Sequence, residues 1–150
     1  MEIRETNIFE VLKVENTGSI PPQIILNNST LNDSIQVIGG VLEAQYTVDD
    51  KYLLFITEGN PLEEALYIYL LDNKLSIKDT LELSANYASG IFNNPLIIGL
   101  DSLRFSFFEK DDNWLLTVSD NPKVSFFNFK YPVQRKRAFL SKIWLQLKKS

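Results

Sequence analysis

The chain has 150 residues, of which 45% are hydrophobic and 12% aromatic, and this predicts one β-rich domain over residues 1–150. It contains no cysteine and no histidine, and its formal net charge is −4. The lack of cysteine excludes disulfides and thiol nucleophiles, and the lack of histidine excludes Ser-His-Asp catalysis and most zinc and copper sites.

Short apolar stretches rich in Ile, Val, Phe and Tyr recur between turn signals, which is typical of β-strands. In chain order they predict strands at Ile8–Val14, Ile20–Leu26, Ile35–Val48, Tyr52–Thr57, Leu66–Leu71, Ser76–Leu83, Leu96–Ile98, Ser102–Glu109, Trp114–Ser119 and Val124–Phe129. The third strand is long, and Gly39-Gly40 within it predicts a bulge or a break. Asn121-Pro122 is expected to interrupt a strand. The pattern predicts a mainly β fold, either an antiparallel sandwich or an open barrel or meander.

The end of the chain has a different periodicity. Five apolar residues recur there at the spacing of one helical face: Phe139, Leu140, Ile143, Trp144 and Leu147. Pro132 precedes them, at a position where a helix start tolerates proline. This pattern predicts one basic amphipathic helix over residues 132–150, packed on the sheet.

Charge is distributed unevenly along the chain. Residues 1–122 hold all 19 acidic residues and 7 basic ones, a net charge of −12, whereas residues 123–150 hold 8 basic residues and no acidic ones. The basic helix has three interpretations: docking on the acidic body, contact with an anionic membrane surface, or binding of nucleic acid. We favour the first, because a body of this charge repels nucleic acid and anionic lipid.

No targeting or membrane signal is visible in the sequence. No stretch approaches the roughly 18 apolar residues of a membrane span, and the first residues have mixed charge. We therefore expect a cytoplasmic protein without a membrane span and without a nucleic-acid partner.

Several acidic clusters are candidates for a catalytic or a metal-binding site. Two carboxylates such as Glu63-Glu64, with Glu58 before them, can act as acid and base in glycoside hydrolysis. Adjacent residues on an extended segment point in opposite directions, so a solvated acidic loop is the favoured interpretation. Asp49-Asp50 and Asp111-Asp112-Asn113 lack the spacing of a calcium loop and are interpreted as turns. No catalytic residue, metal site or cofactor is predicted, and we do not expect an enzyme.

The stretch Tyr52–Glu58, with Glu63–Asp72 after it, resembles small bacterial immunity proteins that accompany polymorphic or contact-dependent toxins. The resemblance implies a small, acidic, cytosolic protein without catalytic residues, and no shared motif assigns a role to a particular residue. Charge agrees with this, because a toxin that attacks nucleic acid needs a positive cleft. A negative inhibitor of that toxin gains encounter rate and specificity.

We therefore predict a protein-binding domain that binds and neutralises a basic toxin domain. The predicted contacts are exposed loop acids and an aromatic anchor: Asp49, Asp50, Glu58, Glu63, Glu64, Tyr67, Asp111, Asp112 and Trp114. Three alternatives stay open at this point. They are a ligand-binding barrel or sandwich with an apolar pocket, a hydrolase that uses carboxylates alone, and an assembly subunit that docks through the basic helix.

Overall fold

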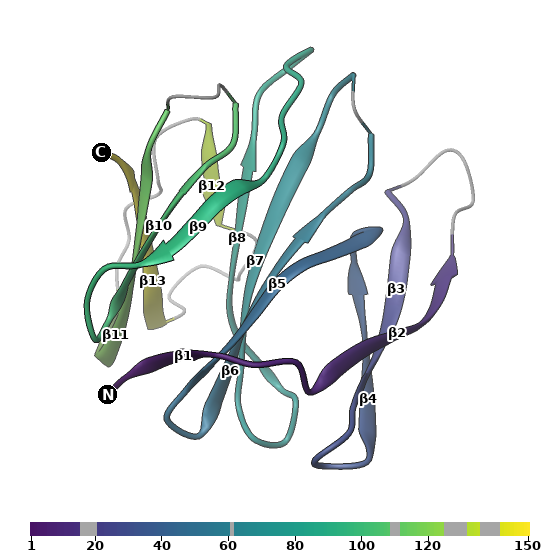
Figure 1. Ribbon diagram of the computed structural model, residues 1–150, viewed down its shortest axis with the longest axis vertical. Coiled ribbons are helices and arrows are strands. Elements are labelled where there is room, and N and C mark those ends of the chain that lie inside the picture. The colour runs from purple at the N-terminus through teal and green to yellow at the C-terminus, as the bar shows by residue number, and fades with distance from the viewer. Residues whose placement is uncertain (16–20, 61, 109–111, 125–131, 136–141) are drawn as a thin grey trace.

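The computed structural model describes residues 1–15, 21–60, 62–108, 112–124, 132–135 and 142–150. All regular elements in these ranges are β-strands, and the strand pairs are antiparallel. The strands form three sheets that lie beside one another as layers (Figure 1). The predicted mainly β, antiparallel fold is confirmed, and the sheets do not close into a barrel.

The middle layer, here called the central sheet, has six strands. They are β1 (Ile3–Glu5), β5 (Val41–Val48), β6 (Lys51–Thr57), β7 (Ala65–Leu71), β8 (Ile77–Ser84) and β12 (Val133–Arg135). Their spatial order is β1-β5-β6-β7-β8-β12, so β5 to β8 form a meander with a short strand added at each edge.

The two flanking layers are smaller. The outer sheet has the order β13-β11-β10-β9 and consists of β9 (Asn93–Ile97), β10 (Ser102–Ser106), β11 (Trp114–Val124) and β13 (Lys142–Lys149). The small sheet has the order β2-β3-β4 and consists of β2 (Phe9–Glu15), β3 (Gln23–Asn28) and β4 (Asp33–Ile38).

Each face of the central sheet has its own hydrophobic core. Leu53 and Phe55 of β6 pack in the cluster shared with the outer sheet, whereas Leu54 and Ile56 pack in the cluster shared with the small sheet. Because side chains alternate along a strand and both faces are covered, β6 and β7 are continuous apolar runs. The layered stack therefore follows from two adjacent strands that have no polar face.

Gly39 and Gly40 lie where the chain leaves the small sheet and enters the central sheet. β4 ends at Ile38 and β5 begins at Val41, so the predicted break is confirmed and the long strand is two strands in different layers. Gly39 has φ +139°, and a Cβ on it would lie 2.1 Å from Ile56 Cγ2. A Cβ on Gly40 would lie 2.5 Å from the backbone oxygen of Glu58. The crossing between layers thus requires two residues without side chains.

The substitution Gly39→Ala is expected to lower the free energy of unfolding by about 3 kcal/mol, because it adds both backbone strain and overpacking. Gly99→Ala is the matched control, since its Cβ would meet no atom closer than 3.9 Å. We expect this control to stay within about 0.5 kcal/mol of the parent protein. Urea unfolding measures both variants, and equal stability of the two would contradict this account of the crossing.

The predicted C-terminal helix is wrong for the described part of that segment. Residues 133–135 form β12 and residues 142–149 form β13, while residues 136–141 lie outside the described residues. Leu145 and Leu147 are buried and Gln146 is exposed, which is the alternation of a half-buried strand. Pairing with β11 along the edge of the outer sheet outweighs the helical spacing of the apolar residues.

The described part of the C-terminal segment contributes to the hydrophobic core. Val133, Leu145 and Leu147 belong to the core between the central and outer sheets. Deleting residues 133–150 would therefore remove core side chains and two strands. The segment is an integral part of two sheets rather than a separate docking element.

Other predicted strands differ in extent. β11 continues through Asn121-Pro122 to Val124, with a register shift between Val118 and Lys123, so the proline irregularity lies within a strand instead of ending it. Of the strand predicted at Val124–Phe129, residues 125–129 lie outside the described residues. The short strand β1 was not predicted, because three residues carry too little periodicity to be recognised.

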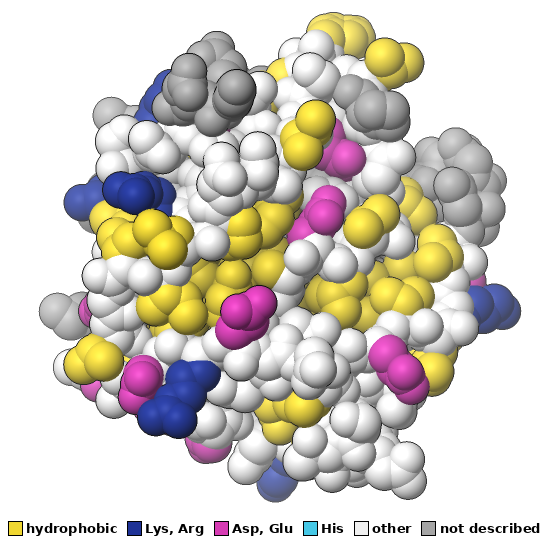
Figure 2. Space-filling view, in the orientation of Figure 1, with side chains coloured by type: hydrophobic (Ala, Val, Ile, Leu, Met, Phe, Trp, Pro, Cys, Tyr) yellow, Lys and Arg dark blue, Asp and Glu magenta, His cyan; other side chains and the backbone are white. Residues whose placement is uncertain are grey.

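Hydrophobic side chains gather in two groups on the face shown in Figure 2, one over β9 and the other over β5 and the small sheet. In the small sheet, Val11 lies opposite Leu26 and Val14 lies opposite Ile24. The two valines are 41% and 51% exposed, although their partners on the same face are fully buried. The inner face of the small sheet is therefore covered at β3 but remains exposed at Val11 and Val14 of β2.

Candidate functional site: an acidic hollow

Four glutamates line one hollow at the end of the central sheet where β6 stops and β7 starts. The hollow has a volume of about 380 Å³, and we call it the acidic hollow. Its glutamates are Glu58, Glu63, Glu64 and Glu82. The polar residues around them are Asn60, Ser84, Asn86 and Gln134. Three of the predicted loop acids therefore lie together, and a fourth acid from β8 joins them.

The loop between β6 and β7 is closed by its own hydrogen bonds. The backbone N–H of Glu58 donates to the Ala65 oxygen at 3.0 Å, which continues the ladder of the two strands. Oε1 of Glu64 accepts the N–H of Gly59 and that of Ala65, both at 3.0 Å. Gly59 has φ +89°, a conformation that glycine adopts readily. Glu64 thus fixes the loop that presents Glu58 and Glu63.

Glu64 differs from its neighbours in burial. It is 7% exposed, although the sequence predicted an exposed acid. Burial raises the pKa of the Glu64 carboxyl above its ordinary value, while the hydrogen bonds from Ala65 and Gly59 act in the opposite direction. Its role is to hold the loop, whereas Glu63 is exposed and Glu58 is half-buried.

Tyr67 lies beside the acidic hollow on β7. Its ring is 5% exposed, and its hydroxyl donates a hydrogen bond to Oε2 of Glu58 at 3.3 Å. Burial and the negative charges of Glu82 and Glu58 raise the pKa of the Tyr67 hydroxyl. The hydroxyl therefore stays protonated at neutral pH and remains a hydrogen-bond donor to Glu58, which lines the acidic hollow.

Glu82 was missed by sequence reasoning. It lies on β8 between Leu81 and Leu83, and that alternation already places it on the face opposite the two leucines. The pairing of β7 with β8 sets Glu82 directly across from Tyr67, and the pairing with β12 sets it across from Gln134. The alternation of residues indicates the face of β8 on which Glu82 lies, but only the register identifies Tyr67 and Gln134 as its neighbours.

Two other predicted acids, Asp49 and Asp50, do not line the acidic hollow. Asp49 and Asp50 form the turn between β5 and β6, and Asp49 has φ +56°, as the turn interpretation requires. Asp50 accepts a hydrogen bond from Lys51 Nζ at 3.0 Å, and this contact lowers the pKa of the Asp50 carboxyl. The full length of β6, about 20 Å at roughly 3.3 Å per residue, separates this turn from Glu58.

Asp112 and Trp114 are part of the interior. Asp112, expected to be exposed, is 7% exposed, and its carboxylate accepts three hydrogen bonds. The donors are the N–H groups of Phe107 and Phe108 and the indole Nε1 of Trp114, at 2.9, 3.0 and 2.9 Å. Asp112 therefore holds the connection from β10 to β11. Asp111 lies outside the described residues.

We expect Asp112→Ala to lower the free energy of unfolding by about 2 kcal/mol, because three donors lose their acceptor. The tryptophan emission should shift to longer wavelength, since the Trp114 indole loses its partner and gains access to water. Asp120→Ala is the control, as Asp120 is an exposed aspartate on the neighbouring strand. Chemical unfolding followed by fluorescence gives both quantities, and unchanged stability and emission would refute this structural role.

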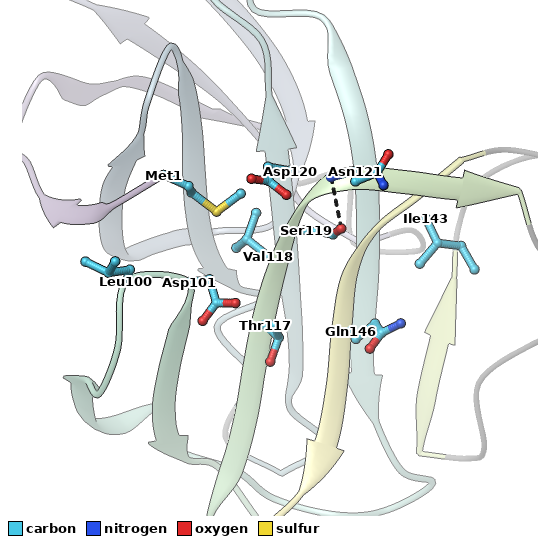
Figure 3. A pocket seen from close by; sticks show the side chains of 10 residues that line it. All are labelled: Met1, Leu100, Asp101, Thr117, Val118, Ser119, Asp120, Asn121, Ile143 and Gln146. Carbon is cyan, nitrogen blue, oxygen red and sulfur yellow. Dashed lines mark hydrogen bonds between the residues drawn. The ribbon is translucent and has the colours of Figure 1, made fainter.

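A larger hollow of about 980 Å³ lies beside β11 and β13 (Figure 3). Asp101 and Asp120 line it, with Ser119, Asn121 and Gln146. Its polar groups bond to near neighbours: Asp101 accepts from the Ser102 hydroxyl at 2.8 Å. None of the predicted site residues that the structure describes lines this hollow, so it is separate from the acidic hollow.

The described residues contain neither a carboxylate cluster for a metal ion nor a helix that could span a membrane. Among them, no three carboxylates are grouped so that they would hold one metal ion. In the same ranges, no helix has the length and apolarity that crossing a membrane takes.

Comparison of the chain with protein-family models, with curated proteins and with solved structures finds no match.

Proposed function

We propose that this protein is a non-catalytic binding domain that holds a basic protein partner at the acidic hollow. The observation that carries the proposal is the convergence of Glu58, Glu63, Glu64 and Glu82 around one hollow beside Tyr67. Among the described residues that line the hollow, the charged ones are all glutamates, and such a lining favours lysine or arginine of a partner.

The acidic hollow combines two features of binding sites with strong energetic contributions. Tyr67 is a buried aromatic residue whose hydroxyl holds Glu58 of the hollow, and aromatic residues are enriched among the contacts that dominate binding. The β6–β7 loop is held in place by Glu64, so little conformational entropy is lost when a partner binds. Glu58 and Glu63 therefore flank a carboxylate that already holds its neighbours Gly59 and Ala65 in place.

We further propose that the partner is a toxin domain and that binding neutralises it. The resemblance of Tyr52–Glu58 and Glu63–Asp72 to immunity proteins supports this, because these segments include three of the four glutamates of the acidic hollow, Glu58, Glu63 and Glu64. A nuclease-type toxin carries a positive cleft, and an acidic hollow that covers such a cleft would block its substrate.

Affinity capture from the source cells tests the proposal. The full chain is used as bait at low and at moderate salt, and the retained proteins are identified by mass spectrometry. We expect a stoichiometric basic partner whose retention falls progressively with salt, because charge pairs are screened. A chain that retains no partner at low salt and stays monomeric would overturn the proposal.

A further inference from the structure

A groove of about 450 Å³ lies between the last strand of the small sheet and the face of the central sheet. One wall is β4, at Gln36, Val37 and Ile38, and the floor includes Tyr69 of β7 with Ile77 and Thr80 of β8. We call it the β4 groove. It exists because the small sheet has three strands and the central sheet has six, so the small sheet ends before β8 is covered.

The wall of the β4 groove is the backbone edge of β4, which has no strand beside it on that side among the described residues. The N–H of Gly39 donates to the Pro22 oxygen at 2.8 Å, next to the pair Gln23–Ile38. Backbone groups of alternate residues point to opposite sides of an antiparallel strand, so those of Ile38 point away from β3. The Tyr69 hydroxyl donates to the Ile38 oxygen at 2.9 Å, which confirms that this oxygen faces the groove.

The same alternation applies two residues earlier. Gln36 pairs with Ile25 in the same register, so its N–H and C=O also point toward the β4 groove. Among the described strands, β4 is the last of its sheet and has a hydrogen-bonded neighbour on one side only. The groove therefore offers donors and acceptors at the spacing that an extended chain matches.

The floor of the β4 groove suits the side chains of an added strand. Tyr69 and Thr80 are 4% and 6% exposed, and Ile77 is half-buried against the same core. Stacked sheets lie roughly 10 Å apart, so a strand added beside β4 would place alternate side chains on this floor. Apolar side chains at alternate positions would complete the packing between the layers.

The negative charge near the β4 groove favours a basic segment as its occupant. Glu82 lines both the β4 groove and the acidic hollow, so the groove leads toward the glutamates described above. A segment with apolar residues on the floor side and lysine or arginine between them complements both features.

We propose that the β4 groove takes an extended, basic segment of the partner protein as the fourth strand of the small sheet. The identity of the donor protein rests on the proposed function, whereas the mode of binding rests on the edge of β4. The backbone of the segment pairs with Gln36 and Ile38, and its alternate apolar side chains cover Tyr69 and Ile77.

A designed peptide tests this mode without the partner. The probe is a nine-residue peptide of alternating valine and lysine with blocked ends, titrated into the ¹⁵N-labelled full chain. We expect the amides of Gln36 and Ile38 to shift and to gain protection from solvent exchange. The amide of Glu10, on the strand at the other edge of the small sheet, should not change.

Two N-methylated twins of the peptide make the test specific for backbone pairing. One twin carries methyl groups on the valine nitrogens and the other on the lysine nitrogens. When the valines face the floor, the N–H groups of only one residue type face β4. One twin should therefore bind like the parent peptide and the other roughly tenfold more weakly or worse. Equal affinities of the twins, or a parent peptide that does not bind, overturn the inference.

Two substitutions at Gln36 provide a second test of backbone pairing with β4. Gln36→Pro removes the N–H that faces the groove and leaves the ladder with β3 intact, whereas Gln36→Ala changes only the side chain. We expect loss of peptide binding in the first variant and retention in the second. If Gln36→Pro does not fold, the methylated peptides decide the question alone. Failure of the capture experiment alongside discrimination between the twins would reject the proposed function and keep the strand-binding groove.

Discussion

Replacing Asp79 by alanine is expected to lower the free energy of unfolding by about 4 kcal/mol, because several buried donors lose their acceptor at once. Asp79 is fully buried on β8, and its Oδ2 accepts the N–H groups of Trp144 and Leu145 on β13, both at 2.9 Å. Its Oδ1 accepts the N–H of Thr80 at 2.9 Å. This carboxylate therefore joins the central sheet to the edge strand of the outer sheet.

The effect of Asp79 is measured by urea unfolding and by hydrogen exchange. Asp79→Asn keeps one carbonyl oxygen and should lose about half as much stability as Asp79→Ala. Asp33→Ala is the control, because Asp33 is exposed and its carboxylate accepts a hydrogen bond from the N–H of the adjacent Ser34 at 2.8 Å. In Asp79→Ala the amides of Trp144 and Leu145 should exchange much faster. Stability equal to that of the Asp33 variant would show that the two sheets do not depend on this link.

The double substitution Glu58→Gln/Glu63→Gln should weaken binding of the captured partner about 100-fold, which corresponds to roughly 2.7 kcal/mol. Both residues line the acidic hollow, and the substitutions remove charge while they keep side-chain shape. The loss should appear mainly as faster dissociation, because contacts at the site itself are weakened. Surface plasmon resonance resolves the association and dissociation rates.

The matched control for the acidic hollow is Asp49→Asn/Asp50→Asn. It removes the same amount of charge from a turn at the other end of β6, and asparagine tolerates the positive φ of Asp49. Each double variant removes two negative charges, so both should slow association slightly by weakening electrostatic steering. Only the variant of the acidic hollow should dissociate faster. Equal effects of the two variants would move the contact away from the acidic hollow.

Two strands of the central sheet could be predicted from the sequence although their residues do not alternate between apolar and polar. Tyr52–Thr57 and Leu66–Leu71 were predicted as strands from their residue types, and both are strands in the structure. Their lack of alternation has a physical cause, since two layers cover the central sheet and leave neither face polar. The turn at Asp49-Asp50 was also predicted from its residue types, and Asp49 adopts the positive φ that aspartate tolerates in such turns.

The C-terminal segment shows where local pattern fails. Ile143, Trp144 and Leu147 have helical spacing, but Leu145, Gln146 and Leu147 also alternate as a strand does. Both patterns are present, and the choice depends on whether a partner strand is available. β11 supplies that partner, and Asp79 supplies acceptors for two of the β13 amides. This choice is non-local, because Asp79 lies more than 60 positions before them in the chain.

The strands from β5 to β8, the turn at Asp49 and the acidic body could be predicted from the sequence, because residue type and nearest neighbours control these properties. The C-terminal strand and the grouping of the acids could not, since both depend on the tertiary structure. It placed Glu82 across from Tyr67, buried Asp112 under three donors and separated Asp49 and Asp50 from Glu58 by the length of a strand. The physical reason is that burial and pairing are set by register and by the stacking of three layers, and these contacts join residues that are distant in the chain.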